Sequence, residues 1–303
     1  MRDGILIINK EAGYTSGDVV AKLRGILHTR KIGHTGTLDP AAVGVLPVCI
    51  GSATKAVEYL TDHDKEYRAV LELGVTTTTQ DLTGDVIEKR DVSGLTQERI
   101  REAVRSFEGD ILQVPPMYSA LKVNGVRLYE MARKGQTVER KARPVHIERA
   151  TVDAVRLPYV DLTIVCSKGT YIRTLCEDIG KALGVGGAMA HLLRTRVGAF
   201  GLEEALTLSE IEKKAKSGTI DALIRPVEDV FPYERVKVTE PAFSRLQNGN
   251  TLSAECFERE PSGSPLLVFS PDGVFFGIYE QRGESYSCQK MFQTREDGPK
   301  CRS

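Results

Sequence analysis

The strand-like and helix-like segments of this sequence do not follow the regular strand–helix–strand order of a doubly wound parallel sheet. The clearest strand pattern runs from Tyr67 to Leu73, where apolar residues alternate with residues such as Arg68 and Glu72. A period of two predicts a strand with one face toward the core. We therefore predict an α+β fold, built on a large mixed, mainly antiparallel sheet with flanking helices.

Other segments add to this sheet and its helices. Apolar runs predict strands over 5–8, 43–50 and 160–166, and helical spacing predicts helices over 15–28, 100–107, 172–183 and 206–215. Thr15 and Asp18 have the spacing of a capping box at the start of the first helix. From about Pro232, short strands and turns such as Pro271-Asp272-Gly273 take over.

The change to short strands and turns near Pro232 predicts two domains. We assign residues 1–231 to a catalytic domain and residues 232–303 to a small β-rich domain that ends in a frayed tail. Because the predicted core elements all precede Phe231, a chain that ends there is expected to stay folded.

The charge of the chain indicates no class of partner, because 41 basic residues balance 41 acidic ones. A nucleic-acid site would therefore have to be a local patch. The one candidate lies between residues 122 and 149, beside Tyr118 and Tyr129, and its composition alone favours a solvated charged face over an RNA site. Its basic residues are Lys122, Arg127, Arg133, Lys134, Arg140, Lys141, Arg143 and Arg149.

The chain offers no pattern typical of metal or disulfide chemistry. Its six cysteines form no CxxC pair and its five histidines lack HExxH spacing, so we predict reduced core thiols and no metal. The N-terminal apolar run is too short for a signal peptide, and no later run could span a bilayer. We predict a cytoplasmic protein with no membrane partner.

One short segment, GHTGTLDP at residues 33–40, surrounds a single carboxylate, Asp39. Gly33 and Gly36 allow dihedrals that other residues avoid, and Pro40 favours an extended Asp39. Taken alone, an Asp in such a loop more often caps a helix or turn than performs chemistry. The same structural default applies to His34, Tyr67 and Arg173.

Four further segments accompany GHTGTLDP in a fixed order, and together they change this assessment. They are KEYRAVLELG (65–74), PPMYSALKVNGVRLYEMARKG (115–135), CSKGTYIRTL (166–175) and LLRTRVG (192–198). Over roughly residues 4–230 the chain resembles the TruB family, the tRNA pseudouridine-55 synthases. Its last domain is similar to the small PUA-type β domain of these enzymes.

The resemblance implies that the protein isomerises a uridine in the T loop of tRNA to pseudouridine. Because the base is only detached, turned and rejoined through C5, the reaction needs no cofactor and no metal. Asp39 matches the catalytic aspartate, which acts as the nucleophile on the uracil ring or the sugar, or stabilises the cationic sugar. Arg173 matches the arginine that opposes its charge. Tyr67 matches the tyrosine that packs on the target ring, and it is the candidate base.

The resemblance also implies a set of substrate-binding residues. His34 matches the histidine that takes the place of the extruded nucleotide, and the basic segment, taken as 115–149, matches an insertion that grips RNA. This chain has Lys10-Glu11 where the family usually has Lys-Pro, and Ala188 where it often has His. The remaining candidate substrate-binding residues are Lys10, Lys55, Tyr171, Leu192, Arg194, Arg140, Lys141 and Arg143.

Two other classes of function compete with a stand-alone tRNA enzyme. An RNA-folding module would open and re-pair the T loop without chemistry, and one enzyme can combine both roles, but folding alone would not need Asp39, Tyr67 and Arg173. A guide-RNA-dependent relative, resembling the archaeal and eukaryotic branch, would not need an insertion that grips RNA in cis. We therefore expect an enzyme that acts on tRNA without a guide RNA, as a monomer.

Overall fold

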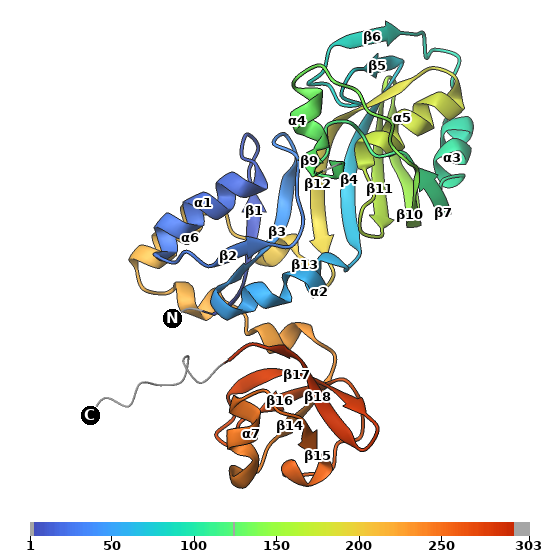
Figure 1. The fold of residues 1–303 in the computed structure, drawn as a ribbon. Coiled ribbons are helices and arrows are strands. Elements are labelled where there is room, and N and C mark those ends of the chain that lie inside the picture. The colour runs from blue at the N-terminus through green and yellow to red at the C-terminus, as the bar shows by residue number, and fades with distance from the viewer. Residues whose placement is uncertain (1–2, 124, 294–303) are drawn as a thin grey trace.

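The structure, a computed structural model, describes residues 3–123 and 125–293. Its larger part is a nine-stranded sheet with helices on its faces, and its smaller part is a five-stranded sheet that follows it along the chain (Figure 1). The predicted α+β class with a large mixed sheet is confirmed.

The large sheet has the order β1-β3-β12-β4-β11-β10-β7, with β2 on β3 and β13 on β12. Every pairing is antiparallel except that between β3 and β12. Its strands are β1 (Gly4–Lys10), β2 (Ile32–His34), β3 (Val43–Ile50), β4 (Lys65–Leu73), β7 (Gly109–Gln113), β10 (Arg143–Arg156), β11 (Tyr159–Cys166), β12 (Gly187–Val197) and β13 (Phe200–Gly201). The pairing of β12 with both β3 and β4 joins the two halves of the sheet.

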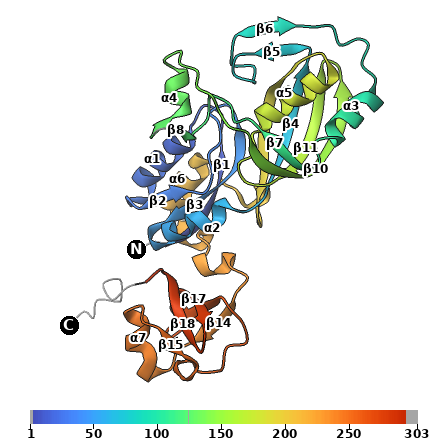
Figure 2. The same ribbon diagram turned by 45° about the vertical axis from the view of Figure 1, so that its right-hand side comes forward.

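Helices cover this sheet in two groups that lie apart in both ribbon views (Figures 1 and 2). The helices α1 (Ser16–Leu27) and α6 (Leu208–Lys216) pack against β1 and β3, while α3 (Gln97–Arg105) and α5 (Ile172–Leu183) pack on the β4, β10 and β12 side. The capping box predicted for Thr15 and Asp18 is present at the start of α1. Shorter helices are α2 (Val57–Thr61), α4 (Leu128–Ala132) and α7 (Phe243–Gln247), with 3-10 turns at Gly51–Ala56, Leu202–Glu204, Ile220–Leu223, Val227–Val230, Glu240–Ala242 and Ala254–Cys256.

Two excursions leave the large sheet. The first is a hairpin of β5 (Val75–Thr77) and β6 (Val86–Lys89). The second lies between β7 and β10 and carries β8 (Lys122–Val123), β9 (Val126–Arg127) and α4. Because β10 already pairs with β7 at Arg143, the insertion covers about 114–142, and the predicted end at residue 149 is wrong.

The small C-terminal sheet has the order β14-β16-β17-β18-β15. The turn predicted at 271–273 lies between β16 and β17, and Gly273 adopts the left-handed backbone that favours glycine there (φ +89). The strands are β14 (Glu234–Lys237), β15 (Leu252–Ser253), β16 (Leu266–Phe269), β17 (Phe275–Arg282) and β18 (Ser285–Met291). The predicted tail, from residue 294 on, lies outside the described residues.

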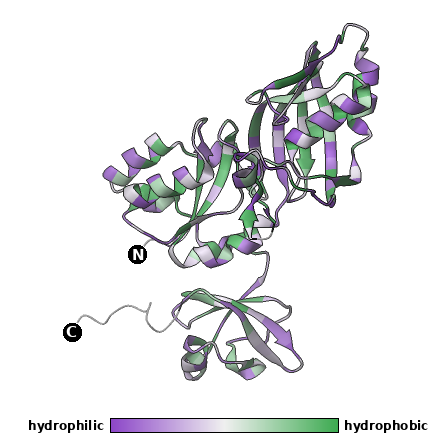
Figure 3. Cartoon of the chain, turned by 45° about the horizontal axis from the view of Figure 1, so that its top comes forward, coloured by the Kyte–Doolittle hydropathy of each residue, from purple (hydrophilic) through white to green (hydrophobic). Residues whose placement is uncertain are grey.

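The two sheets share apolar packing. One buried cluster contains Ile5 and Val45 from the large sheet together with Leu267 and Phe292 from the C-terminal domain. Figure 3 shows hydrophobic residues concentrated along the strands of both domains, whereas the surface helices are mixed. The boundary predicted at Phe231 therefore lies within a continuous apolar contact, since Phe231 itself belongs to this cluster.

Candidate active site

Asp39 and Arg173 form a two-point ion pair. Asp39 lies in the loop between β2 and β3, and Arg173 is the second residue of α5. Arg173 Nε lies 2.9 Å from Asp39 Oδ2, and Arg173 Nη2 donates to Asp39 Oδ1 at 3.2 Å. The Arg173 side chain is 6% exposed and that of Asp39 is 35% exposed. The guanidinium thus approaches the carboxylate from inside the protein and leaves it open to solvent on the other side.

Arg173 has further partners that fix its orientation. Its guanidinium donates to the carbonyl oxygens of Tyr118 at 2.7 Å and Thr79 at 3.3 Å, and it pairs with Asp81 at 3.6 Å. Sequence reasoning missed Asp81. The only signal was a Thr-rich turn sequence, and nothing in one sequence links it to a helix about 94 residues further on.

Two sets of opposing effects act on the pKa of Asp39. Burial raises the pKa of the Asp39 carboxyl above its ordinary value, and the charge of Asp81 acts in the same direction. Arg173 and Lys10 oppose the rise, with Arg173 the stronger of the two. Among the groups around Asp39, Arg173 is therefore the one that most favours its ionised form.

The loop around Asp39 is held by the segment that follows β1. Ser16 Oγ accepts from the Leu38 amide at 2.9 Å, and Lys10 Nζ donates to the Pro40 carbonyl at 3.2 Å and the Tyr14 carbonyl at 2.6 Å. Lys10 is fully buried, and burial lowers its pKa to about 8. The ammonium of Lys10 therefore lies inside the protein and stabilises the loop by hydrogen bonds to carbonyl oxygens.

The glycines of GHTGTLDP do not have the conformation that the sequence suggests. Neither Gly33 nor Gly36 has a positive φ, so the expected special dihedrals are wrong. Gly44 shows the constraint instead, since its φ is +105 and an added Cβ would lie 2.2 Å from the Arg194 carbonyl oxygen. Only glycine allows β3 to approach β12 this closely.

Arg194 is a buried side chain that connects these strands by hydrogen bonds. It is 1% exposed, and its Nε donates to the Val45 carbonyl at 2.7 Å while Nη2 donates to the Gly36 carbonyl at 3.4 Å. Across the sheet, Arg194 of β12 pairs with Tyr67 of β4. Its contacts are therefore with the protein, and they link the Asp39 loop to β12 and β4.

Apolar side chains complete this side of the site. Tyr67, Leu192 and Leu38 belong to one buried cluster, with Tyr67 8% exposed. Burial raises the pKa of the Tyr67 phenol, an effect that the nearby guanidinium of Arg194 only partly opposes. A phenol whose pKa is raised stays protonated at neutral pH, and a protonated phenol is not available as a base.

His34 and Tyr171 flank the site. His34 Nδ1 accepts from the Gly36 amide at 3.3 Å, and burial lowers the His34 pKa, which favours the neutral ring. The Tyr171 amide donates to Gln113 Oε1 at 2.7 Å, and Gln113 Nε2 donates back to the Tyr171 carbonyl at 3.1 Å. These two hydrogen bonds between Gln113 and Tyr171 position the first turn of α5, and with it Arg173.

Four predicted residues lie outside this group. Lys55 Nζ donates to the Met291 carbonyl at 2.8 Å, which places Lys55 between the two domains and away from the Asp39 loop. Arg140 donates to the Pro115 carbonyl at 3.0 Å and so braces the base of the insertion. Lys141 and Arg143 are exposed to solvent.

Comparison with known proteins identifies the family. Residues 24–172 match the model of the TruB family pseudouridylate synthase (N terminal domain), and residues 173–231 match that of the tRNA pseudouridylate synthase B C-terminal domain. The chain belongs to the TruB family. A tRNA pseudouridine synthase B from Bacillus pumilus (strain SAFR-032) is 44% identical over 287 residues, which cover 92% of this chain and 93% of the relative. One from Clostridium tetani (strain Massachusetts / E88) is 40% identical over 290 residues, covering 95% and 99%.

This TruB protein is therefore a pseudouridine synthase, an isomerase that modifies RNA. Solved structures share its fold over nearly the whole chain. A Cbf5-Nop10-Gar1 complex matches with a TM-score of 0.73 and 27% identity, covering 97% of this chain and 86% of that chain. An H/ACA RNP bound to a substrate RNA containing 2'-deoxyuridine matches with a TM-score of 0.73 and 25% identity, covering 98% and 87%.

Other sequence predictions for this TruB protein concern thiols, metals and membranes. Cys49, Cys166, Cys176 and Cys256 are free and buried, and Cys288 is free and half-buried. Within residues 3–123 and 125–293, no three His, Cys, Asp or Glu side chains gather in a way that could hold a metal ion. Among the helices of these same residues, none has the length and apolar character needed to cross a membrane.

Proposed function

We propose that this enzyme converts the uridine at position 55, in the T loop of tRNA, to pseudouridine, with Asp39 as the nucleophile. The observation that carries the proposal is the two-point pair between Asp39 and Arg173, in which the guanidinium favours the ionised carboxylate and leaves it open to solvent. The names of the relatives, tRNA pseudouridine synthase B, support tRNA as the substrate.

The proposed reaction conserves every atom of the nucleotide. The target uridine leaves the RNA stack and enters the site beside Asp39. The bond between N1 and C1′ breaks, the ring turns, and a bond forms between C5 and C1′, while C5 loses a proton and N1 gains one. Asp39 attacks C6 of the ring or C1′ of the sugar, and both routes require its ionised form.

The surrounding residues bind and exclude water in this proposal. Tyr67 and Leu192 pack on the uracil ring, and Tyr171 lies beside it at the start of α5. His34, neutral and beside the Asp39 loop, occupies the place of the extruded nucleotide. The closed complex removes water from Asp39, which makes the charge of Arg173 more important as the reaction begins.

The insertion and the C-terminal domain supply RNA affinity in this proposal. Exposed basic residues of the insertion, Lys122, Arg127, Arg133, Lys134 and Lys141, neutralise phosphates, so no guide RNA is needed. We propose that the five-stranded C-terminal domain is PUA-like and adds contacts to the rest of the tRNA. The enzyme acts as a monomer in the cytoplasm.

The test is to map pseudouridine in unmodified tRNA after treatment with the purified protein and its Asp39→Asn variant. We expect product at position 55 with the parent and none with Asp39→Asn, because an amide is a far weaker nucleophile. Asp64→Asn, a change of an exposed carboxylate, is the matched control and should retain parent activity.

Binding to tRNA, measured at fixed salt, separates the possible outcomes. Asp39→Asn should bind as well as the parent, since most of the affinity comes from phosphates and stacking. Near-parent isomerisation by Asp39→Asn would refute its role as nucleophile. Product at a site other than position 55 would refute the proposed target.

A further inference from the structure

A cavity of about 520 Å³ lies among the loop between β5 and β6, the start of the insertion and α5. Its lining includes Thr79, Gln80 and Tyr118, next to Thr174 and Glu177 of α5. Two of these residues, Thr79 and Tyr118, hold Arg173 through their carbonyl oxygens. The cavity is therefore bounded by the supports of the catalytic arginine.

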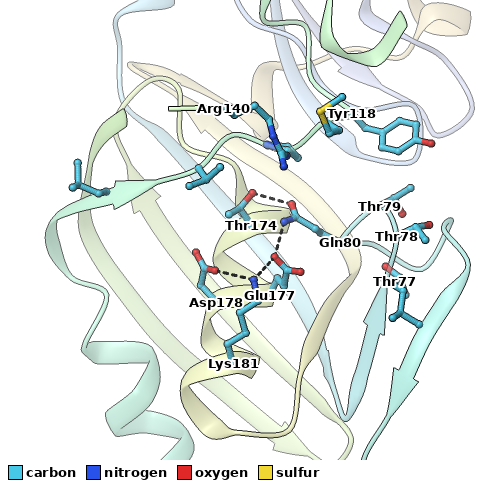
Figure 4. A pocket seen from close by; sticks show the side chains of 15 residues that line it. Thr77, Thr78, Thr79, Gln80, Tyr118, Arg140, Thr174, Glu177, Asp178 and Lys181 are labelled. Atoms are coloured by element: carbon cyan, nitrogen blue, oxygen red, sulfur yellow. Dashed lines mark hydrogen bonds and ion pairs between the residues drawn. The ribbon is translucent and has the colours of Figure 1, made fainter. Parts of the chain in front are cut away.

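Gln80 lines this cavity and connects the loop to the helix (Figure 4). Its Nε2 donates to Glu177 Oε2 at 2.6 Å, and its Oε1 accepts from Thr174 Oγ1 at 2.9 Å. Both hydrogen-bonding atoms of the amide are thus engaged by one helix. Thr174 directly follows Arg173, and Glu177 lies one turn further on.

The backbone of Gln80 is held as firmly as its side chain. Its φ of +65 is the left-handed conformation, which costs a residue with a Cβ roughly 1 kcal/mol or more. Its carbonyl accepts from the Met189 amide of β12 at 3.0 Å. A residue in a strained conformation persists only where its surroundings determine it, and such positions gather at functional sites.

The neighbours of Gln80 act on Arg173 directly. The residue before it, Thr79, offers its carbonyl to Arg173, and the residue after it, Asp81, offers its carboxylate. Three consecutive residues of the loop therefore engage Arg173 or the helix that carries it. Among the hydrogen bonds and ion pairs of the described residues, those that join the loop to α5 without the Gln80 amide are the long contacts to Arg173, of 3.3 Å and 3.6 Å.

We propose that Gln80 is a positioning residue for the catalytic arginine. Its amide locks the loop that carries Asp81 onto the first turns of α5, so that Arg173 meets Asp39 in a single two-point geometry. The inference rests on the proposed roles of Asp39 and Arg173, and it adds a residue that touches neither Asp39 nor Arg173 through its side chain.

Loosening this lock has a consequence that can be measured as a pH profile. Asp39 is faced by Arg173 from α5, by Asp81 from the loop and by Lys10 from β1. If Arg173 moves away, the carboxylate loses its strongest opposing charge while its burial remains. The pKa of Asp39 then rises. On lowering the pH, the rate therefore begins to fall at a higher pH than in the parent.

The test variant is Gln80→Gly, because glycine tolerates the left-handed backbone while the side chain and its amide are removed. We expect the single-turnover rate of pseudouridine formation to fall roughly ten- to hundredfold, since small misplacements of catalytic groups have effects of this size. The acid limb of the rate–pH profile should move to higher pH, and tRNA affinity should stay within about twofold of the parent. Lys181→Ala is the matched control, because Lys181 also contacts Glu177 Oε2, at 2.8 Å, but from the exposed side.

A second variant, Thr174→Val, removes one partner of Gln80 from the helix side. It should shift the rate and the acid limb in the same direction, and the double variant should be no slower than Gln80→Gly alone, because both changes break one connection. A lower thermal midpoint with an unchanged rate and pH profile in either variant would overturn the proposal, since it would show a role in folding only. A parent protein with no isomerase activity, or an active Asp39→Asn variant, would instead refute the proposed function.

Discussion

Arg173 joins more of the site than any other side chain described above. It contacts two carboxylates and two carbonyl oxygens, which belong to three separate parts of the chain. A planar guanidinium can satisfy several acceptors at fixed angles, whereas an ammonium is a point charge on a flexible stem. The identity of this residue, and not only its charge, is therefore required by the geometry.

Arg173→Lys tests this requirement. The variant keeps the positive charge but cannot form the two-point contact with Asp39, so we expect the rate of isomerisation to fall about a hundredfold or more. The acid limb of the rate–pH profile should also move upward. Single-turnover kinetics between pH 5 and 9 provide the measurement, and a rate within a few-fold of the parent would contradict the assignment.

Lys10 provides a prediction about stability. Its pKa is about 8 in the folded protein and near 10.5 in the unfolded chain, so between these values the unfolded chain binds more protons. The contribution of Lys10 to the free energy of unfolding should therefore increase as the pH rises from about 8 to 10.5. Relative to Lys10→Met, the parent should gain at most about 3 kcal/mol over this range.

Urea unfolding of both proteins at pH 7.5, 9 and 10 measures this difference. Using the variant as the reference removes the contributions of the tyrosines and cysteines that titrate in the same range. A stability difference that shrinks or stays constant with pH would show that the ammonium is better accommodated by its three carbonyl acceptors than its burial indicates.

Among the elements, those with a strong local pattern could be predicted from the sequence. The capping box and apolar spacing located α1, and the alternation along 67–73 located β4 with its inward face. The parallel contact between β3 and β12 could not be predicted, because it joins residues about 150 apart and depends on the close approach at Gly44. The carboxylate Asp81 was missed for a similar reason, since its loop has no period and acquires its role only through α5.

The insertion between β7 and β10 also changes how its residues should be tested. Arg140 braces the insertion through Pro115, and Arg143 already belongs to β10, so neither is a simple probe of RNA contact. The exposed residues Arg133, Lys134 and Lys141 are better probes.

Replacing Arg133, Lys134 and Lys141 together with Ala should weaken tRNA binding and flatten its salt dependence. If the three contact phosphates, the slope of log affinity against log salt should fall by roughly two to three. Lys213, Lys214 and Lys216 of α6 provide a matched triple variant elsewhere on the surface. Equal slopes of log affinity against log salt for the two triple variants would show that the insertion is a solvated charged face and does not contact RNA.

At the scale of the whole molecule, the two domains unfold as one unit if their apolar cluster is continuous. Phe292 is 1% exposed and packs against Phe275 of the C-terminal domain and Phe231 at its border. Across the boundary, Tyr59 packs edge-on against Phe231, with ring centroids 5.3 Å apart. The expectation that a chain ending near Phe231 stays folded ignored this packing, which no local sequence pattern reveals.

Calorimetry of the full chain should therefore give a single cooperative transition. Phe292→Ala should lower the free energy of unfolding by about 3 to 5 kcal/mol, because it empties a buried site at the junction. A chain truncated after Phe231 should have a lower thermal midpoint and a greater tendency to aggregate, since it exposes the apolar face around Ile5 and Val45. Two well-separated transitions in the full chain would contradict this account.

The shared cluster also sets a rule for hybrids between relatives. A domain joined only by a flexible linker can be exchanged as a cassette, because each partner carries its own complete core. Here Leu267 and Phe292 complete a packing that Ile5 and Val45 begin. A hybrid joined at Phe231 would combine two apolar faces from different proteins, whose side chains do not fit each other. A stable exchange must therefore include the facing residues of β1 and β3 along with the transplanted domain.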